Sequence, residues 1–182
     1  CKHPLVRRLL RGIRLAVPPE PRYSSLWDVN VVLRLFWSWR ANKYVSRKEL
    51  SAKLAMLLCL ISCRRVSNVR TLDLSGRVFT PHGVSFHVSR RTKSSSKVVS
   101  YPAFLDVLKL CVVRCLKAHE NMTEELRPPS GEDQLLIALT KPHKGVSSPT
   151  IARWVLQEAG INMQCFSHTS HSSLTSDLCS LE

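Results

Sequence analysis

The stretch Ile61-Ser-Cys-Arg-Arg-Val-Ser-Asn-Val-Arg-Thr-Leu-Asp-Leu74 joins the end of a strongly apolar helical pattern to the start of a second, shorter helix. Arg64 and Arg65 stand at the junction, and Arg70 lies one turn further on. A guanidinium at such a corner can be anchored by the core behind it while its fork of donors faces outward, a geometry that suits bidentate contact with a phosphate. The alternative is that these arginines are solvated charges at a helix end.

The segment before this stretch has a clear helix start. In Val45-Ser-Arg-Lys-Glu-Leu50, Ser46 is the expected cap and Glu49 closes a capping box. The apolar residues that follow recur on one helical face: Leu50, Leu54, Leu57, Leu58 and Ile61. We expect this buried helix to hold Arg65 in place, and Ser67 to cap the next helix.

Periodicity predicts helices at both ends of the chain. Residues 3–16 form an arginine-rich amphipathic helix, which the proline-rich linker at 17–22 ends. A second helix begins near Ser25, and Trp37 belongs to its apolar stripe. Towards the C-terminus, Ser148 is the expected cap of a further helix.

The middle of the chain predicts a small sheet followed by a helix. Residues 75–101 have β character, because Val84, Phe86 and Val88 alternate with polar residues, and residues 97–101 supply a partner strand. An amphipathic helix is expected over 103–119, with these residues facing inward: Leu105, Leu108, Val112, Cys115 and Leu116. Residues 135–139 are expected to form a short buried strand or the start of a turn.

Composition indicates a packed and strongly basic protein. Of the 182 residues 44% are hydrophobic, and 27 basic against 13 acidic residues give a net charge of +14. Such an excess predicts a polyanionic partner, nucleic acid before any other. No stretch reaches the ~20 apolar residues of a membrane span, so we expect no membrane partner. The chain begins without Met or a signal peptide, and we expect it to be a fragment.

The seven cysteines show no disulfide framework, because their number is odd and their spacing irregular. Two pairs stand four apart within apolar helical patterns: Cys59 with Cys63, and Cys111 with Cys115. This predicts buried thiols and a reducing intracellular compartment. Cys165, His168 and His171 are spaced as metal ligands can be, but a fourth ligand has no evident source, so we expect no metal and no cofactor.

Several motifs together resemble the tyrosine recombinases of DIRS and Ngaro retroelements. Arg65-Val-Ser-Asn-Val followed by Leu72-Asp-Leu is similar to their first catalytic-arginine motif, although Asn68 stands where the family usually has an acidic residue. The other similar segments follow the family's order: His3-Pro-Leu-Val with Pro18-Pro and Trp27-Asp-Val, Thr92-Lys93, residues 110–118 with Leu126-Arg-Pro128, Gly160-Ile161, and His168.

The resemblance implies a mainly α domain with a small antiparallel β-sheet (α+β), in which Arg65, Lys93 and His168 converge on one basic face. Arg65 and His168 would clamp the scissile phosphate, and Lys93, in the turn between two strands, would protonate the departing 5′ oxygen. His171 stands where the family has its second catalytic arginine, and it offers a single, pH-dependent contact instead of a permanent charge.

The resemblance also implies a tyrosine nucleophile after the His168 motif. Tyr23, Tyr44 and Tyr101 all precede that motif, so we expect this chain not to cleave DNA. The basic residues expected to contact double-stranded DNA are Arg64, Arg70, Arg90, Arg91, Lys97, Lys141, Lys144 and Arg153.

Residues 1–44 are expected to be the end of an N-terminal arm with its linker, and residues 45–182 the catalytic-type domain. Relatives of this type act in the nucleus as tetramers that exchange a C-terminal segment, and we expect this chain to be monomeric. Two alternatives remain open. One is a domesticated, non-catalytic module that binds DNA or protein, and the other is an unrelated basic helical protein that binds RNA.

Overall fold

A computed structural model describes residues 3–16, 28–62, 66–88, 98–127 and 133–158. Within these ranges the chain combines helices with one small antiparallel sheet, which confirms the predicted mixture. The elements in order are α1 (Pro4–Ala16), α2 (Val29–Ser38), η1 (Asn42–Tyr44), α3 (Arg47–Ser62), α4 (Val66–Val69), β1 (Arg77–Thr80), β2 (Gly83–His87), β3 (Val98–Pro102), α5 (Val112–Thr123), η2 (Glu124–Leu126) and α6 (Ser148–Glu158).

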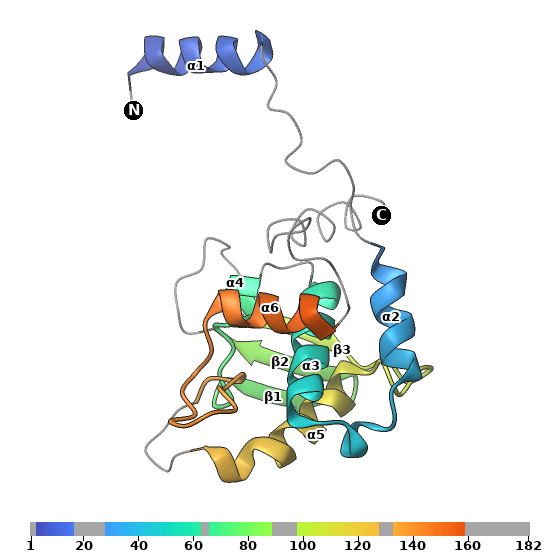
Figure 1. Cartoon of the computed structure of the whole chain (residues 1–182). Coiled ribbons are helices and arrows are strands. Elements are labelled where there is room, and N and C mark those ends of the chain that lie inside the picture. Colours follow the sequence, from blue (N-terminus) through green and yellow to red (C-terminus); the bar gives the residue numbers. More distant parts are fainter. Residues whose placement is uncertain (1–2, 17–27, 63–65, 89–97, 128–132, 159–182) are drawn as a thin grey trace.

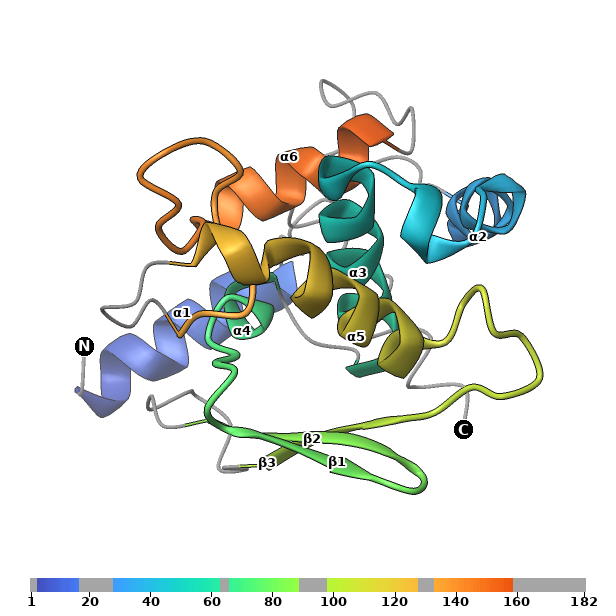
Figure 2. The ribbon, with the colours of Figure 1, turned by 90° about the horizontal axis from the view of Figure 1, so that it is seen from below.

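Helix α3 runs through the middle of the body, with α5 and α6 packed along it and the sheet forming a separate layer (Figure 2). Every residue from 50 to 59 is buried, so the helix is enclosed on all sides rather than along one stripe. The expected inward position of Ile61 is wrong, since this side chain is 36% exposed. The core therefore surrounds α3, and the other elements are placed by their contacts with it.

The capping box that starts α3 is confirmed. Ser46 N–H donates to Glu49 Oε2 at 2.8 Å, and Glu49 N–H donates to Ser46 Oγ at 3.2 Å. Hydrogen bonding to Ser46 lowers the pKa of Glu49, since it stabilises the carboxylate. Val45 and Leu50 are both buried beside this cap. The sequence thus sets the first residue of the central helix.

The three strands form an antiparallel sheet in the order β1-β2-β3. Val84, Phe86 and Val88 are buried, which confirms their predicted alternation, and β3 is the predicted partner strand. The Phe86 and Tyr101 rings meet edge to face with centroids 5.9 Å apart. The inner face of the sheet therefore belongs to the same core as α3.

Gly76 brings the segment that follows α4 against the end of β2. Its carbonyl accepts a hydrogen bond from His87 N–H at 2.7 Å. A Cβ at position 76 would lie 2.4 Å from the carbonyl oxygen of His87, which no side chain can occupy without moving the backbone. This contact joins the end of β2 to the segment that follows α4.

Helix α5 begins at Val112, so the prediction of a helix from residue 103 is wrong over its first part. Leu105 is 70% exposed and Leu108 44% exposed, whereas the later predicted core positions are buried. The reason lies at the sheet, because Ala103 N–H donates to His82 O at 2.7 Å and holds residue 103 at the sheet edge. The residues between this sheet edge and Val112 connect the sheet to α5, which packs on α3.

Helix α2 begins at Val29, later than the predicted start near Ser25, which lies outside the described residues. Asp28 is its N-cap and accepts a hydrogen bond from Asn30 N–H at 2.8 Å. The inward placement of Trp37 is also wrong, since Trp37 is 54% exposed. Phe36, which belongs to the same predicted stripe, is buried together with Val32 in the core cluster that surrounds α3.

Two other predicted caps are wrong. Helix α4 begins at Val66, so Ser67 lies inside it rather than capping it. Helix α6 begins at Ser148, and Ser147 Oγ accepts from Thr150 N–H at 3.4 Å. At the start of α6 two serines are adjacent, so the sequence alone cannot show which of them caps the helix, and the backbone conformation decides.

Helix α1 lies apart from the body (Figure 1). Its predicted extent is confirmed, and its apolar side chains are exposed: Leu5, Leu9, Leu10 and Ile13. No helix of the described residues is long and apolar enough to cross a membrane.

A polar pair is buried between α3 and α5. Ser51 Oγ donates to Arg47 O at 2.8 Å, so it accepts from His119 Nε2 at 3.1 Å. This assigns the neutral Nε2–H tautomer to His119, and Nδ1 has no partner among the described residues. Burial, reinforced by the positive charge of Arg127, lowers the pKa of His119 to about 4.

We predict that Gly76→Ala lowers the free energy of unfolding by at least about 2 kcal/mol, because the added methyl meets backbone rather than a mobile side chain. Urea denaturation followed by circular dichroism measures the change. Gly12→Ala is the matched control, since nothing lies within 4 Å of its added Cβ and α1 gains helix propensity. Equal stability of the two variants would contradict the close approach of Gly76 and His87.

We also predict that stability falls as the pH drops from 6.5 towards 4, because the unfolded chain protonates His119 and the folded chain resists it. In the His119→Asn variant the fall in the free energy of unfolding over this pH range should be smaller by up to about 3 kcal/mol, whatever the stability of the variant at neutral pH. Urea denaturation across this pH range measures it. The exposed His82→Asn is the control and should follow the wild type. Parallel pH profiles for wild type and His119→Asn would contradict the prediction.

Candidate nucleic-acid interface

The predicted site residues divide into two groups. Four of the residues expected to contact DNA are described and all four are exposed: Arg70, Lys141, Lys144 and Arg153. The others lie outside the described residues: Arg64, Arg65, Arg90, Arg91, Lys93, Lys97, His168 and His171. Convergence of Arg65, Lys93 and His168 on one face therefore stays a prediction.

Lys141 and Lys144 line a hollow of about 540 Å³, which we call the loop hollow. Its walls are Lys48, the segment from Ala138 to Ser147 without His143, Thr150 and Trp154. Three lysines and no acidic residue face this space. Three ammonium groups around one concave surface focus a positive potential, which attracts an anionic group and can hold it by charge-assisted hydrogen bonds.

A tight loop presents these lysines. Leu135, Leu136 and Ile137 are buried, and Ile137 forms an isolated antiparallel bridge with Gly145. Ala138 N–H donates to Lys144 O at 2.7 Å and closes the loop. The predicted short strand is therefore a buried segment with a single bridge, and it serves as the base from which Lys141 and Lys144 extend into solvent.

Helix α6 forms one wall of the loop hollow and carries Arg153. Ile151 and Ala152 are buried against the core, and Arg153 is exposed. The helix packs on both α3 and α4 (Figure 1). The N-terminus of α6 is part of the hollow, since Ser147 and Thr150 line it, and the partial positive charge of a helix N-terminus adds to that of the lysines. The predicted residues Lys141, Lys144 and Arg153 therefore come from one continuous piece of structure.

Helix α4, which covers the middle of the quoted stretch, packs against α6. Val66 and Val69 are buried, and Arg70, which follows α4, is exposed. The end of β2 lies on the same side of the molecule as α4, as Figures 1 and 2 both show. His87 pairs with Val98 there, so the described residues that flank 89–97 lie on this side.

Tyr101 and Tyr44 differ in exposure. Tyr101 is 1% exposed, and its ring packs against Phe86 in the core, so its hydroxyl cannot reach a DNA phosphate. Tyr44 is 65% exposed, with Lys43 Nζ 4.6 Å from its ring centroid. Tyr23 lies outside the described residues.

The thiols of the described residues are part of the core. Cys59, Cys111 and Cys115 are buried and free, which confirms the prediction for three of the four paired cysteines, while Cys63 is not described. Burial raises the pKa of Cys59 and of Cys115 to about 12, so both are protonated at neutral pH. Among the described residues no group of three histidine, cysteine or acidic side chains could hold a metal ion.

Sequence reasoning missed two sets of basic residues. Lys48 joins the loop hollow although it belongs to the capping turn of α3. A second set surrounds another hollow: Lys43, Lys109, Arg114 and Lys117. The sequence feature that could have indicated these residues is the absence of Asp and Glu from 29–48 and from 107–119. The fold brings these two stretches together, because α5 contacts η1.

No protein-family model, curated protein or solved structure matches this chain.

Proposed function

We propose that this chain is a DNA-binding domain of the tyrosine recombinase type, derived from a DIRS- or Ngaro-like retroelement and acting in DNA integration and recombination. It binds double-stranded DNA as a monomer in the nucleus. It does not itself cleave DNA.

The loop hollow is the observation that carries this proposal. Lys48, Lys141 and Lys144 surround it without an acidic residue, and Arg153 is exposed on the adjoining helix. Phosphate contacts of this kind position a protein on a duplex and provide most of its salt-dependent affinity. The net charge of +14 favours the same partner over the whole chain.

The arrangement of the motifs supports the recombinase type. The arginine motif stands between the buried helix α3 and the short α4, and the segment with Lys93 joins two antiparallel strands. The hydrogen bond from His87 N–H to Gly76 O joins the end of β2 to the segment that follows α4. This contact supports a phosphate site formed by Arg65 and Lys93, because the first segment follows the arginine motif and β2 leads into the segment with Lys93.

The residues of the chain argue against cleavage. Tyr101 is buried, and Tyr44 belongs to η1, before the motif that precedes the family's nucleophile. His171 would offer one contact where the family's arginine offers a bidentate pair. Phosphate binding by Arg65 and its neighbours survives these changes, because binding needs positive charge and not a nucleophile.

We predict that Lys141→Gln with Lys144→Gln weakens binding to duplex DNA for every sequence tested, since these contacts go to phosphates. The slope of log affinity against log salt should become shallower by roughly 2, about one for each phosphate contact. Fluorescence anisotropy across a salt series measures both effects. Arg114→Gln with Lys117→Gln is the control of equal charge, and it should change the slope by less than half as much.

Equal slopes for these two double variants would contradict a DNA site at the loop hollow. A single-stranded RNA competitor separates the alternative of an unrelated RNA-binding protein. We expect duplex DNA to compete better than RNA of equal length, and a preference for RNA would favour that alternative.

We further predict that incubation with a nicked duplex, which traps the covalent intermediate of tyrosine recombinases, yields no protein–DNA adduct. Denaturing gel electrophoresis of labelled DNA detects such an adduct. Should one form, the proposed loss of cleavage is wrong, and Tyr44→Phe and Tyr23→Phe would show which tyrosine attacks.

A further inference from the structure

A second basic hollow lies between η1 and the segment that enters α5, and we call it the η1 hollow. It has a volume of about 310 Å³, near the lower end of the range of ~300–1,000 Å³ for small-ligand pockets. Its lining comprises Ala41, Asn42, Lys43, Leu108, Lys109, Arg114 and Lys117. Four of these side chains are basic and none is acidic, so the density of positive charge is higher than in the loop hollow.

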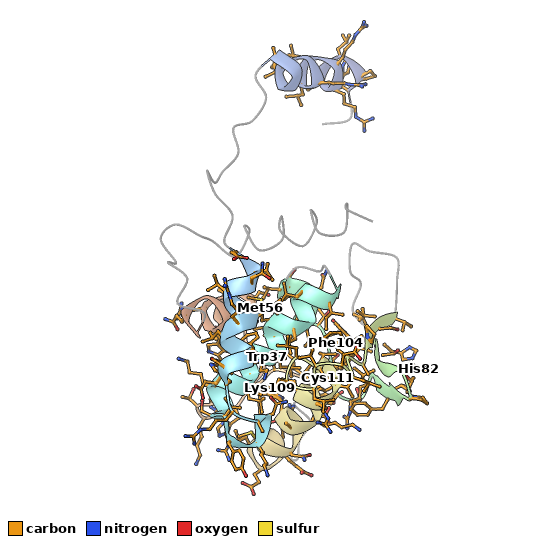
Figure 3. All side chains as sticks on the ribbon, turned by 90° about the vertical axis from the view of Figure 1, so that its right-hand side faces the viewer. Trp37, Met56, His82, Phe104, Lys109 and Cys111 are labelled. Carbon is orange, nitrogen blue, oxygen red and sulfur yellow. The ribbon has the colours of Figure 1, made fainter. Side chains whose placement is uncertain are left out.

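The four cations of the η1 hollow have no carboxylate partner among the described residues. Lys109 Nζ donates to Trp37 O at 2.8 Å, and Figure 3 shows the two residues beside each other. Lys117 Nζ lies 5.0 Å from the Phe79 ring centroid, and Lys43 lies over Tyr44. Glu120 follows Lys117 on α5, but its ion pair at 3.0 Å is with Arg77. These contacts position the cations and leave their charge uncompensated.

A fifth ammonium group lies behind the wall of the η1 hollow. Lys53 is fully buried on α3, and its Nζ donates to Asn42 Oδ1 at 2.9 Å. The ring of Phe36 also lies near this ammonium group, with its centroid 6.0 Å from Nζ. Burial lowers the pKa of Lys53, and the positive charge of Lys109 lowers it further. A buried cation with no carboxylate partner is costly, and an anion nearby offsets that cost.

Asn42 connects Lys53 to the hollow. Because its Oδ1 accepts from Lys53, the orientation of the amide is fixed, and Nδ2 carries the remaining two donors. Asn42 itself lines the hollow. A phosphate oxygen in this space would meet neutral amide donors, four surface cations and the field of a fifth cation in a low-dielectric interior.

We propose that the η1 hollow binds a compact phosphate-bearing anion, of the size and charge of pyrophosphate. Such a ligand places several negative charges within one small volume, as the clustered cations require. A DNA duplex distributes its charge along an extended backbone and suits the open surface around the loop hollow better. The elements that line the two hollows lie on opposite sides of α3 in Figure 2: α6 with its preceding loop for the loop hollow, and η1 with the segment before α5 for the η1 hollow.

The test uses the full chain and inorganic pyrophosphate in isothermal titration calorimetry. Arg114→Gln with Lys117→Gln should raise the dissociation constant at least roughly tenfold, because both removed charges are exposed and line the hollow. Lys141→Gln with Lys144→Gln removes equal charge from the loop hollow and should change it less than about twofold. Equal effects of the two double variants would overturn the proposal in favour of diffuse charge.

Asn42→Asp tests the link to Lys53. The change is nearly isosteric, gives Lys53 a carboxylate partner and places a negative charge in the hollow. Pyrophosphate binding should be lost while the thermal unfolding midpoint stays the same or rises. Unchanged pyrophosphate affinity in this variant would overturn the proposal.

A duplex DNA titration of the same variants separates the η1 hollow from the proposed function. Loss of DNA affinity in the Lys141/Lys144 variant alone, without any pyrophosphate binding, would overturn this inference and leave the proposed function intact. Loss of DNA affinity in the Arg114/Lys117 variant, again without pyrophosphate binding, would assign the η1 hollow to the DNA surface and overturn the inference as well.

Discussion

The complete burial of α3 is the constraint on which the body depends. Residues 50–59 are enclosed by α5, α6, the sheet and the end of α2. A helix in this position must have every polar side chain satisfied, because a buried donor or acceptor without a partner costs about 1–3 kcal/mol. Two residues of α3, Ser51 and Lys53, therefore determine much of what surrounds it.

Ser51 and Lys53 lead to opposite electrostatic outcomes. His119 remains neutral beside Ser51, since its Nε2–H reaches a hydroxyl and its ring is buried. Lys53 Nζ donates to the amide oxygen of Asn42 but has no carboxylate partner among the described residues. The central helix thus contacts an uncharged polar pair through Ser51, whereas Lys53 adds to an excess of positive charge close to the surface. The η1 hollow is the site of this excess.

The positive charge of the protein is gathered into concave surfaces rather than spread evenly. The loop hollow and the η1 hollow together contain seven lysine and arginine side chains and no acidic residue. The hydrogen bond from Ala138 N–H to Lys144 O closes the loop that carries Lys141 and Lys144, and the packing of α5 on η1 brings Lys43 near Arg114 and Lys117. Cations gathered around one concave surface focus a positive potential, which attracts an anion more strongly than the same charges spread over a flat surface.

Local sequence determined the start of α3, the extent of α1, the alternation along β2 and the burial of the cysteines in helical patterns. Each depends on neighbours within a few residues, through a capping box or a period of 2 or 3.6. The grouping of Lys141, Lys144 and Arg153 also follows from the chain, since one loop and the helix after it carry all three.

Tertiary structure alone decided the rest. The start of α5 depends on the bond between Ala103 and His82, the close approach of Gly76 depends on β2, and the exposure of Trp37 depends on which face of α2 meets the core. The burial of Lys53 and the meeting of Lys43 with Lys109 join residues that are far apart in the sequence. Burial and electrostatic potential are sums over such distant neighbours, so no local pattern contains them.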